Sequence, residues 1–286
     1  IVFSRDELKQ SEMSEIYKRK KIKSIRFFLG DVRDKDRLVR AATGMDIIVH
    51  AAALKQVPAA EYNPMEFIKT NILGASNIIE AAITCNVKKV LALSTDKAAS
   101  PINLYGATKL CSDKLFIAAN NYAGFGKFNF SVVRYGNVMN SRGSVIPLFL
   151  KMKDQKKITV TDKDMTRFNL TLPQGVDFVL KSIKMAKGGE LFVPKIPSYK
   201  IMDVVKAVAP NAKINFIGKR PGEKVDEELI TKSDSVNSLE FKNYFIIFPS
   251  GDDTLKRYYK NKLKGKTLKK DFSYNSRENR YLSVSQ

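Results

Sequence analysis

The stretch Val90-Leu-Ala-Leu-Ser-Thr-Asp-Lys97 decides the fold of this chain. Its first four residues are apolar and uninterrupted, which is typical of a strand buried on both faces of a parallel sheet. The polar turn 94–97 follows the carboxyl end of that strand, where sheets of this kind bind their ligands. We therefore predict a central parallel strand at residues 90–93 with a ligand site directly after it.

Strands and helices alternate on both sides of this central strand. Consecutive parallel strands are joined by right-handed crossovers, so the alternation predicts an α/β fold with a Rossmann-like, doubly wound parallel sheet. A helix starts at Asn63, which caps it, with Pro64 at its first position. The apolar pattern predicts strands at residues 1–3, 25–29, 46–50 and 130–134, and further helices at 6–18, 35–42 and 104–123.

The pattern changes after Tyr135, where proline, glycine and short mixed segments replace the regular alternation. We predict a nucleotide-binding domain at residues 1–135 and a smaller mixed α/β substrate-binding lobe at 136–249. Residues 250–286 are polar and basic and are predicted to form a peripheral, partly mobile tail. The chain opens on an apolar run without an initiator methionine, so we expect a fragment whose first strand is missing.

Composition narrows the class of protein. The 286 residues carry a net charge of +21, which raises the alternative of a polyanion-binding protein. The lysines are spread along the chain without interleaved aromatic residues, so a solvated basic face is favoured, with no nucleic-acid partner. No run is long enough to span a bilayer, and we expect a soluble, cytoplasmic protein without a membrane partner. Cys85 and Cys111 fit no metal-ligand spacing; we predict two buried thiols and no metal.

The residues that follow the outer strands suit a dinucleotide. Ser4 and Arg5 follow the first strand, where an arginine can pair with a 2′-phosphate, which favours NADP over NAD. Asp31 and Val32 follow the second strand and can contact an adenine, although Asp31 is equally suited to a turn. Small side chains at 51–53, Ala51, Ala52 and Ala53, let the backbone approach a cofactor. His50, just before them, is interpreted as a structural residue.

Tyr105 and Lys109 are four residues apart at the start of a predicted helix and therefore lie on one face. A nearby ammonium favours phenolate, so this pair suits a base that works near neutral pH. The opposite face is predicted to be the apolar row, comprising Ala107, Cys111, Leu115 and Ala118. Because the pair follows the buried strand and its polar turn, we predict that it is catalytic.

The chain resembles a known family in several motifs. They include 4–12, Ala53-Leu-Lys-Gln-Val-Pro58, Ser94-Thr-Asp-Lys97, Tyr105-Gly-Ala-Thr-Lys109, Arg134-Tyr-Gly-Asn-Val138, 141–147, Met165-Thr-Arg-Phe168, 192–197 and Arg220-Pro-Gly-Glu223. These are similar to the soluble inverting UDP-N-acetylglucosamine 4,6-dehydratases, extended short-chain dehydrogenase/reductases that begin pseudaminic acid synthesis. The resemblance runs through residue 248 and implies a glycine-rich loop before Ile1.

The resemblance also implies a mechanism and its residues. It implies that Tyr105, helped by Thr95, takes a proton from the hydroxyl on carbon 4, that Lys97 takes one from carbon 5 in its neutral form, and that Asp96 protonates the departing hydroxyl of carbon 6. A homo-oligomer, dimer or hexamer, is expected. The implied substrate-binding residues for UDP-N-acetylglucosamine are Lys55, Asn137, Arg167, Arg220 and Glu223. For the two arginines, an ion pair within the protein is the alternative.

Three other functions stay open at this point. One is a retaining 4,6-dehydratase, whose large membrane-anchored members usually carry methionine at the position of Tyr105. Another is a carbon-5 epimerase of the same lineage. The third is a non-catalytic NADP- or polyanion-binding protein built on the same fold, because a fold does not establish chemistry.

Overall fold

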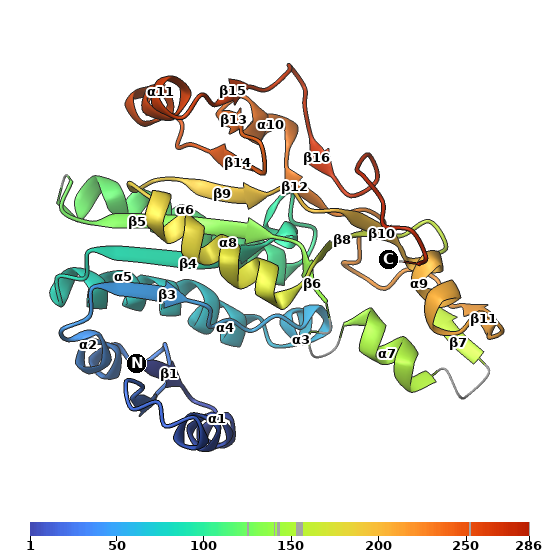
Figure 1. The fold of residues 1–286 in the computed structure, drawn as a ribbon, viewed down its shortest axis with the longest axis horizontal. Coiled ribbons are helices and arrows are strands. Elements are labelled where there is room, and N and C mark those ends of the chain that lie inside the picture. The colour runs from blue at the N-terminus through green and yellow to red at the C-terminus, as the bar shows by residue number, and fades with distance from the viewer. Residues whose placement is uncertain (125, 140, 142–143, 153–156, 252, 286) are drawn as a thin grey trace.

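A seven-stranded mixed sheet forms the centre of the molecule (Figure 1). The computed structural model describes residues 1–124, 126–139, 141, 144–152, 157–251 and 253–285. The strand order is β15-β13-β14-β9-β5-β4-β3, parallel from β3 to β9 and antiparallel from β9 outward. Helices α5 and α6 cover one face and α8 the other, so the predicted doubly wound arrangement is confirmed.

The helices have the following bounds. They are α1 (Glu7–Arg19), α2 (Lys35–Ala42), α3 (Val57–Tyr62), α4 (Pro64–Phe67), the π-helix η1 (Ile68–Leu73), α5 (Gly74–Thr84), the 3₁₀ turn η2 (Asp96–Ala98), α6 (Leu104–Tyr122), α7 (Val145–Met152), α8 (Leu172–Met185), α9 (Ile201–Val208), α10 (Lys232–Ser235) and α11 (Asp253–Lys262). Among the described helices, none combines the length and apolar character that a bilayer crossing requires.

The strands are short outside the central sheet. They are β1 (Val2–Ser4), β2 (Phe27–Leu29), β3 (Ile47–His50), β4 (Lys89–Thr95), β5 (Asn129–Tyr135), β6 (Asn137–Val138), β7 (Lys157–Val160), β8 (Thr166–Leu170), β9 (Leu191–Pro194), β10 (Ser198–Lys200), β11 (Lys213–Phe216), β12 (Glu228–Ile230), β13 (Ser238–Glu240), β14 (Tyr244–Ile247), β15 (Lys266–Thr267) and β16 (Tyr274–Asn275).

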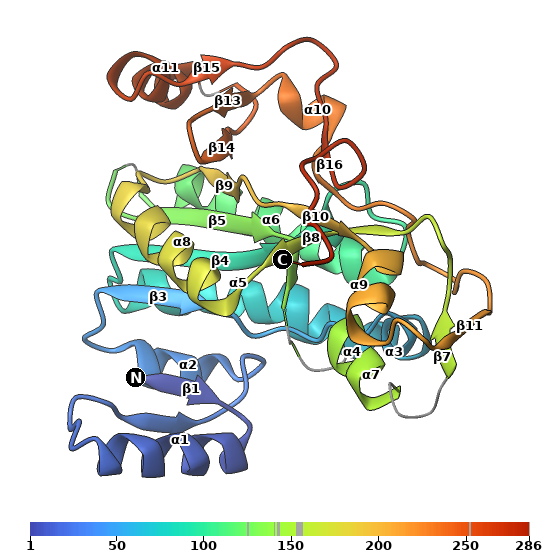
Figure 2. The same cartoon turned by 45° about the vertical axis from the view of Figure 1, so that its right-hand side comes forward.

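The first two strands stand apart from the central sheet. In the described part of the chain, β1 and β2 pair only with each other, in parallel, and lie with α1 beyond the β3 edge (Figure 2). Within the described residues β3 pairs with β4 alone, and its Ile47 and Val49 are 47% and 45% exposed. The predicted single sheet is therefore, in this structure, a seven-stranded sheet and a separate parallel pair.

The helix predicted after Pro64 is broken into three pieces. Asn63 occupies the cap position but makes no side-chain cap hydrogen bond, and the π-helix η1 separates α4 from α5. The residues Ala75, Ile79 and Ala82 pack into the core as the spacing predicts. Asn71, within η1, is buried upstream of that apolar face, four residues before Ala75.

Strands from beyond Tyr135 return to the central sheet. β9 pairs with β5, and β13 to β15 extend the antiparallel side. The separate apolar cluster of the predicted lobe lies around Phe149, Ile158, Met165 and Val205. Residue 135 therefore does not mark the boundary of the sheet. The assignment of substrate binding to the residues beyond it stays a prediction.

The predicted peripheral tail is packed onto the protein. Tyr259 of α11 is fully buried, and its hydroxyl donates to the Met185 carbonyl at 2.9 Å and lies 2.8 Å from Glu190 Oε1. Further on, β16 pairs with β12, and Tyr274 packs in the main core. The polar composition concealed these aromatic anchors; most of the other residues of this part are exposed or partly exposed, and its assignment as a peripheral tail stays a prediction.

Candidate active site

The polar turn after β4 is built by two local caps. The Thr95 hydroxyl accepts from the Lys97 amide at the start of η2, and the Asn103 side chain accepts from the Gly106 amide at 2.8 Å to begin α6. A Cβ at Gly106 would overlap the Lys97 carbonyl oxygen, so glycine allows α6 to approach η2. The turn and the start of the helix are thereby held against each other.

This packing brings four of the predicted catalytic side chains together. Thr95 Oγ1 donates to Asp96 Oδ1 at 2.8 Å, and Lys97 Nζ donates to the same oxygen at 3.1 Å. The Tyr105 hydroxyl hydrogen-bonds with Thr95. Asp96 and Tyr105 are only 1% and 8% exposed. A carboxylate, an ammonium and a phenol therefore lie close together, largely buried, at the carboxyl end of the central strand.

Tyr105 is held as a neutral phenol in this structure. Burial raises its pKa to about 12, while the charge of Lys97 and the hydrogen bond with Thr95 act in the opposite direction. The cation that favours the phenolate is thus Lys97, whereas the sequence pointed to Lys109. The ease with which Tyr105 loses its proton therefore depends on the groups that set the charge of Lys97.

Lys97 is held in its charged form. Burial alone lowers its pKa, but the charges of Asp96 and Glu227 outweigh burial and leave the pKa above that of an ordinary lysine. The ammonium lies 3.1 Å from Asp96 Oδ1 and 3.2 Å from Glu227 Oε1. The neutral amine that we expected from burial and neighbouring groups is therefore not favoured here, because a second carboxylate faces it.

Lys109 lies one helical turn after Tyr105 in α6. It is 3% exposed, and burial lowers its pKa despite the opposing charge of Asp113. His50 is buried beside it; burial and the charge of Lys109 lower the His50 pKa to about 3, so the imidazole is neutral. The structural interpretation of His50 fits its burial, although its Nε2 has no hydrogen-bond partner among the described groups.

The Tyr105–Lys109 face of α6 is the buried face. Asp113 continues it and binds the Ser94 hydroxyl at 2.7 Å and Arg134 at 3.3 Å. By contrast, Cys111 is exposed, and the row predicted to be apolar and inward lies partly toward solvent. The two catalytic candidates share a face as predicted, but the assignment of the opposite face to the core, and of Cys111 to a buried position, is wrong.

Two residues of the site were missed by sequence reasoning. Glu227, 2% exposed, precedes β12 and reaches Lys97 from a point 130 residues along the chain. The side-chain amide of Asn71, in the π-helix, accepts from the Leu54 backbone N–H and donates to the Leu54 carbonyl. It also donates to the Thr108 hydroxyl at 3.0 Å. It therefore fixes the loop after β3 against α6. A polar residue inside an apolar helical row was the one available signal for Asn71; Glu227 had none.

The predicted cofactor residues lie mostly on an open surface. Arg5 is exposed and contacts Asp31 at 3.4 Å, and Arg33 binds the same carboxylate at 2.9 Å. Burial acts to raise the Asp31 pKa, but the hydrogen bonds of Arg33 lower it overall. Val32 packs in the core, and Ser4 accepts from the Asp6 amide. Ala51, Ala52 and Ala53 are exposed, so the backbone after β3 is accessible.

The predicted substrate residues fall into two groups. Arg220 is 64% exposed and pairs with Glu223 at 3.2 Å; their loop is tied to α6 because Asn103 donates to the Gly222 carbonyl at 2.8 Å. Arg167 is buried and donates to three backbone carbonyls of residues 166, 224 and 225. It also lies 3.8 Å from Glu227 and 3.9 Å from Glu223, so it makes ion pairs of the kind considered as its alternative.

The other two substrate candidates also differ from each other. Lys55 is exposed in the loop between β3 and α3. Asn137 lies in β6, opposite Asn169 of β8, and its side-chain oxygen is buried without a hydrogen-bond partner among the described groups. An unpaired buried acceptor is costly, so Asn137 is the candidate of the two whose side chain lacks a donor that a ligand could supply.

Comparison with known proteins agrees with this geometry. A family model described as "Polysaccharide biosynthesis protein" matches residues 1–249. A UDP-N-acetylglucosamine 4,6-dehydratase (inverting) of Campylobacter jejuni is 53% identical over 285 residues, covering 98% of this chain and 84% of that protein. A UDP-glucose 4-epimerase of Rickettsia akari is 44% identical over 257 residues, covering 88% and 74%.

A solved structure extends the similarity to three dimensions. The X-ray structure of Pen from Bacillus thuringiensis matches with a TM-score of 0.89 and 41% identity, covering 99% of this chain and 86% of that one. Sequence and fold thus agree along almost the whole chain, and this chain belongs to the polysaccharide biosynthesis protein family of nucleotide-sugar dehydratases and epimerases.

Proposed function

We propose that this protein is a UDP-N-acetylglucosamine 4,6-dehydratase that inverts carbon 5, at the first step of pseudaminic acid synthesis. One observation carries the proposal: Asp96, Lys97 and Tyr105 lie together in one largely buried cluster beside Thr95. Elimination of water from a sugar needs a base for a hydroxyl, a base for a carbon and an acid for the leaving group. The 53% identity with the inverting dehydratase of Campylobacter jejuni supports the same assignment.

Tyr105 acts on the hydroxyl of carbon 4. Its phenol takes the hydroxyl proton, and Thr95 keeps the phenol oriented through their hydrogen bond. A bound nicotinamide supplies the hydride acceptor and later the hydride donor for this sugar. Lys109 is buried on the same helical face as Tyr105.

Lys97 and Asp96 act on the next two atoms of the sugar. A ketone at carbon 4 acidifies the hydrogen on carbon 5, and the Lys97 amine removes it. Protonated Asp96 gives its proton to the departing hydroxyl of carbon 6. The Oδ2 atom of Asp96 is buried without a hydrogen-bond partner among the described groups, so this oxygen has no competing contact with them.

The chain's own residues fit a nicotinamide dinucleotide. The accessible backbone of Ala51, Ala52 and Ala53 would allow close approach of the cofactor, and Lys109 would hold it from the buried face of α6 that also carries Tyr105. Two guanidinium groups, Arg5 and Arg33, meet at Asp31 beside β1 and β2. They would hold a 2′-phosphate, so we propose NADP as the cofactor.

The loop that contacts the start of α6 supplies two of the proposed substrate-binding residues. Arg220 is an exposed cation there and would neutralise the diphosphate, while Glu223 would accept from a ribose hydroxyl. Asn137 would meet the sugar, with Lys55 at the mouth of the site. We also propose a cytoplasmic homo-oligomer, a dimer or hexamer, which light scattering of the purified protein tests.

Product analysis in deuterated water tests the proposed function. The protein is incubated with UDP-N-acetylglucosamine and NADP, and the product is examined by proton NMR. We expect loss of one water, deuterium at carbon 5 and the inverted configuration at that carbon. Retained configuration would rule out the inverting assignment and favour the retaining dehydratase.

A second candidate is a UDP-sugar 4-epimerase, favoured by the 44% identity with the Rickettsia akari protein. Epimerisation at carbon 4 needs Tyr105 but uses no base at carbon 5 and no acid at carbon 6. The buried Asp96–Lys97 pair supplies those two groups, which favours elimination. A galacto-configured product that keeps its carbon-6 hydroxyl would decide for the epimerase.

A further inference from the structure

Glu227 is a carboxylate at the candidate site that the mechanism above does not use. Its Oε1 lies 3.2 Å from Lys97 Nζ and 3.8 Å from Arg167 Nε. Its backbone is fixed on both sides, because its amide donates to Ser276 Oγ at 2.9 Å and its carbonyl accepts from the Ser276 amide at 2.8 Å. These two hydrogen bonds hold the backbone of Glu227 in place beside Lys97.

The two oxygens of Glu227 have different surroundings. Oε1 faces the two cations, whereas Oε2 is buried without a hydrogen-bond partner among the described groups. A buried carboxylate oxygen without a donor is poorly stabilised as an anion, so this carboxyl can take up a proton at low cost. The other charged or titratable groups that face it are Asp96, Lys224 and Tyr199.

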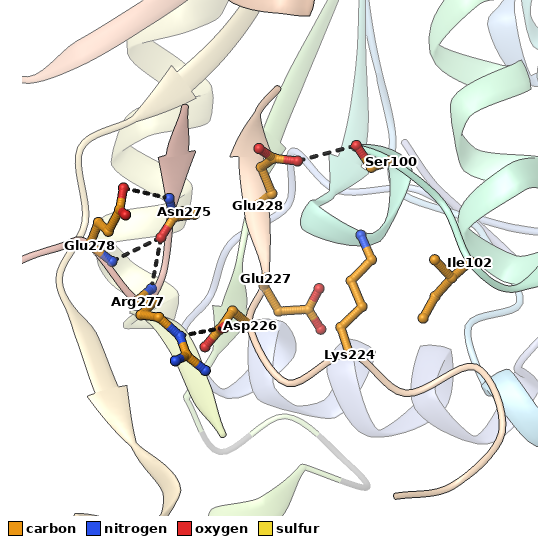
Figure 3. A pocket seen from close by; sticks show the side chains of 9 residues that line it. All are labelled: Ser100, Ile102, Lys224, Asp226, Glu227, Glu228, Asn275, Arg277 and Glu278. Carbon is orange, nitrogen blue, oxygen red and sulfur yellow. Dashed lines mark hydrogen bonds and ion pairs between the residues drawn. The ribbon is translucent and has the colours of Figure 1, made fainter. Parts of the chain in front are cut away.

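Glu227 also lines an open pocket of about 420 Å³ (Figure 3). The lining residues come from the turn after η2, from residues 224–228 and from 275–278, and they do not include Lys97 or Tyr105. In this pocket Asp226 is bound to Arg277, Glu228 to Ser100 and Glu278 to Asn275. Glu227 is thus the carboxylate that belongs both to the pocket lining and to the contacts of Lys97.

We propose that Glu227 is a positioning residue that exchanges a proton with Lys97, so that the lysine amine is uncharged when it meets the hydrogen on carbon 5. This inference rests on the proposed dehydratase function. Elimination requires Lys97 as a neutral amine, whereas the structure favours its ammonium form. Proton transfer to Glu227 reconciles the two.

The proton steps balance as follows. One N–H proton of the Lys97 ammonium moves to Glu227, which leaves a neutral amine beside a neutral carboxylic acid. The amine lone pair then forms an N–H bond as the C5–H bond breaks, and the electron pair stays on the sugar, delocalised into the ketone at carbon 4. When the hydroxyl of carbon 6 leaves with a proton from Asp96, this pair becomes the new double bond.

The electrostatics of the pair agree with this exchange. Burial raises the pKa of Glu227, while Lys97, Arg167 and Lys224 oppose the rise and Asp96 adds to it. In the reverse direction, the charge of Glu227 helps to raise the pKa of Lys97. The proton affinities of the two groups are therefore set by each other, and replacing one changes the titration of the other.

Glu227→Gln tests the inference, with Glu228→Gln as the matched control. The control makes the same chemical change one residue away, on a side chain that binds Ser100 instead of Lys97. Wild type is assayed first by deuterium incorporation at carbon 5. Absence of this signal in wild type contradicts the proposed function itself and leaves no reaction for Glu227 to support.

With an active wild type, we expect Glu227→Gln to lower kcat on the order of 100-fold with little change in KM, the range of a lost proton-transfer partner. The ascending limb of the kcat–pH profile should move to lower pH, because an anion that stabilises the ammonium has gone. Glu228→Gln should keep the wild-type limb.

Three results would overturn the inference. The first is a wild-type kcat in Glu227→Gln. The second is a loss of kcat in that variant that is equal at every pH, which indicates a structural role only. If Glu227→Gln does not fold, Glu227→Asp decides: its shorter carboxylate should move the same limb in the same direction by a smaller amount. A wild-type profile in Glu227→Asp would be the third contrary result.

Discussion

The turn that holds Lys97 and the edge that holds Arg5 belong to the same α/β fold, but their charged side chains differ in solvent exposure. Asp96 and Lys109 are 1% and 3% exposed and interact with charged neighbours. The Arg5 and Arg33 side chains are 55% and 39% exposed around a shared carboxylate. Charges in the buried turn are therefore strongly coupled, whereas charges at the open edge are screened by water.

This contrast implies that substitutions in the buried turn have large, interdependent effects, and that substitutions at the open edge have small, separable ones. Four measurements test it, beginning with the largest expected effect.

Lys97→Arg should abolish dehydration, with a loss on the order of 1,000-fold in kcat, within the range for a general base. Arginine keeps a cation between Asp96 and Glu227 but cannot be deprotonated, so the charge stays and the base is lost. Steady-state product formation measures the loss. Binding of UDP by calorimetry should be nearly unchanged, and an active Lys97→Arg enzyme would show that Lys97 is not the base.

Gly106→Ala should destabilise the fold by roughly 1–3 kcal/mol, the usual range for overpacking, and lower activity as well. The added methyl would meet the Lys97 carbonyl oxygen and push η2 from α6. Gly175→Ala in α8 is the control, since its new methyl would meet only the end of the Leu170 side chain, which belongs to β8. Urea denaturation of both variants gives the comparison, and equal midpoints would contradict this packing argument.

His50 should make the protein less stable in acid. Its folded pKa of about 3 lies below the ordinary value of 6.5, so the unfolded chain binds a proton first as the pH falls. The stability that neutral His50 allows is complete above pH 6.5 and is lost progressively toward pH 3, by about 2 kcal/mol near pH 5. Urea unfolding of wild type and His50→Gln across this range measures it; parallel curves would contradict the assignment.

Arg5→Ala should have the smallest effect, a roughly tenfold weaker preference for NADP over NAD, as expected for one exposed charge on a phosphate. Initial rates with each cofactor measure the ratio. The control is Lys9→Ala, an exposed cation on α1 that pairs with Asp6. An unchanged ratio in Arg5→Ala would move the 2′-phosphate contact to Arg33 or elsewhere.

Local patterns were sufficient for most of the central fold. The apolar run before Ser94 predicted β4, and the bounds of α2 matched residue for residue. The spacing of Tyr105 and Lys109 placed both on one helical face. These features depend on neighbours within a few residues, where periodicity and capping dominate, so one sequence contains them.

Other features depend on contacts that form only after folding. The tail looked peripheral because its polar residues outnumber Tyr259 and Tyr274, yet these two rings anchor it in the core. Glu227 gave no signal because a lone glutamate is ordinary until β12 brings it to Lys97. The charge state of Lys97 followed from that same contact.

The sequence by itself determined the order of strands and helices and which side chains follow the central strand, because those are properties of local chain geometry. Only the tertiary structure decided which side chains are paired, buried and charged. The physical reason is that a pKa depends on desolvation and on charges a few ångströms away, and segments far apart in the chain supply both.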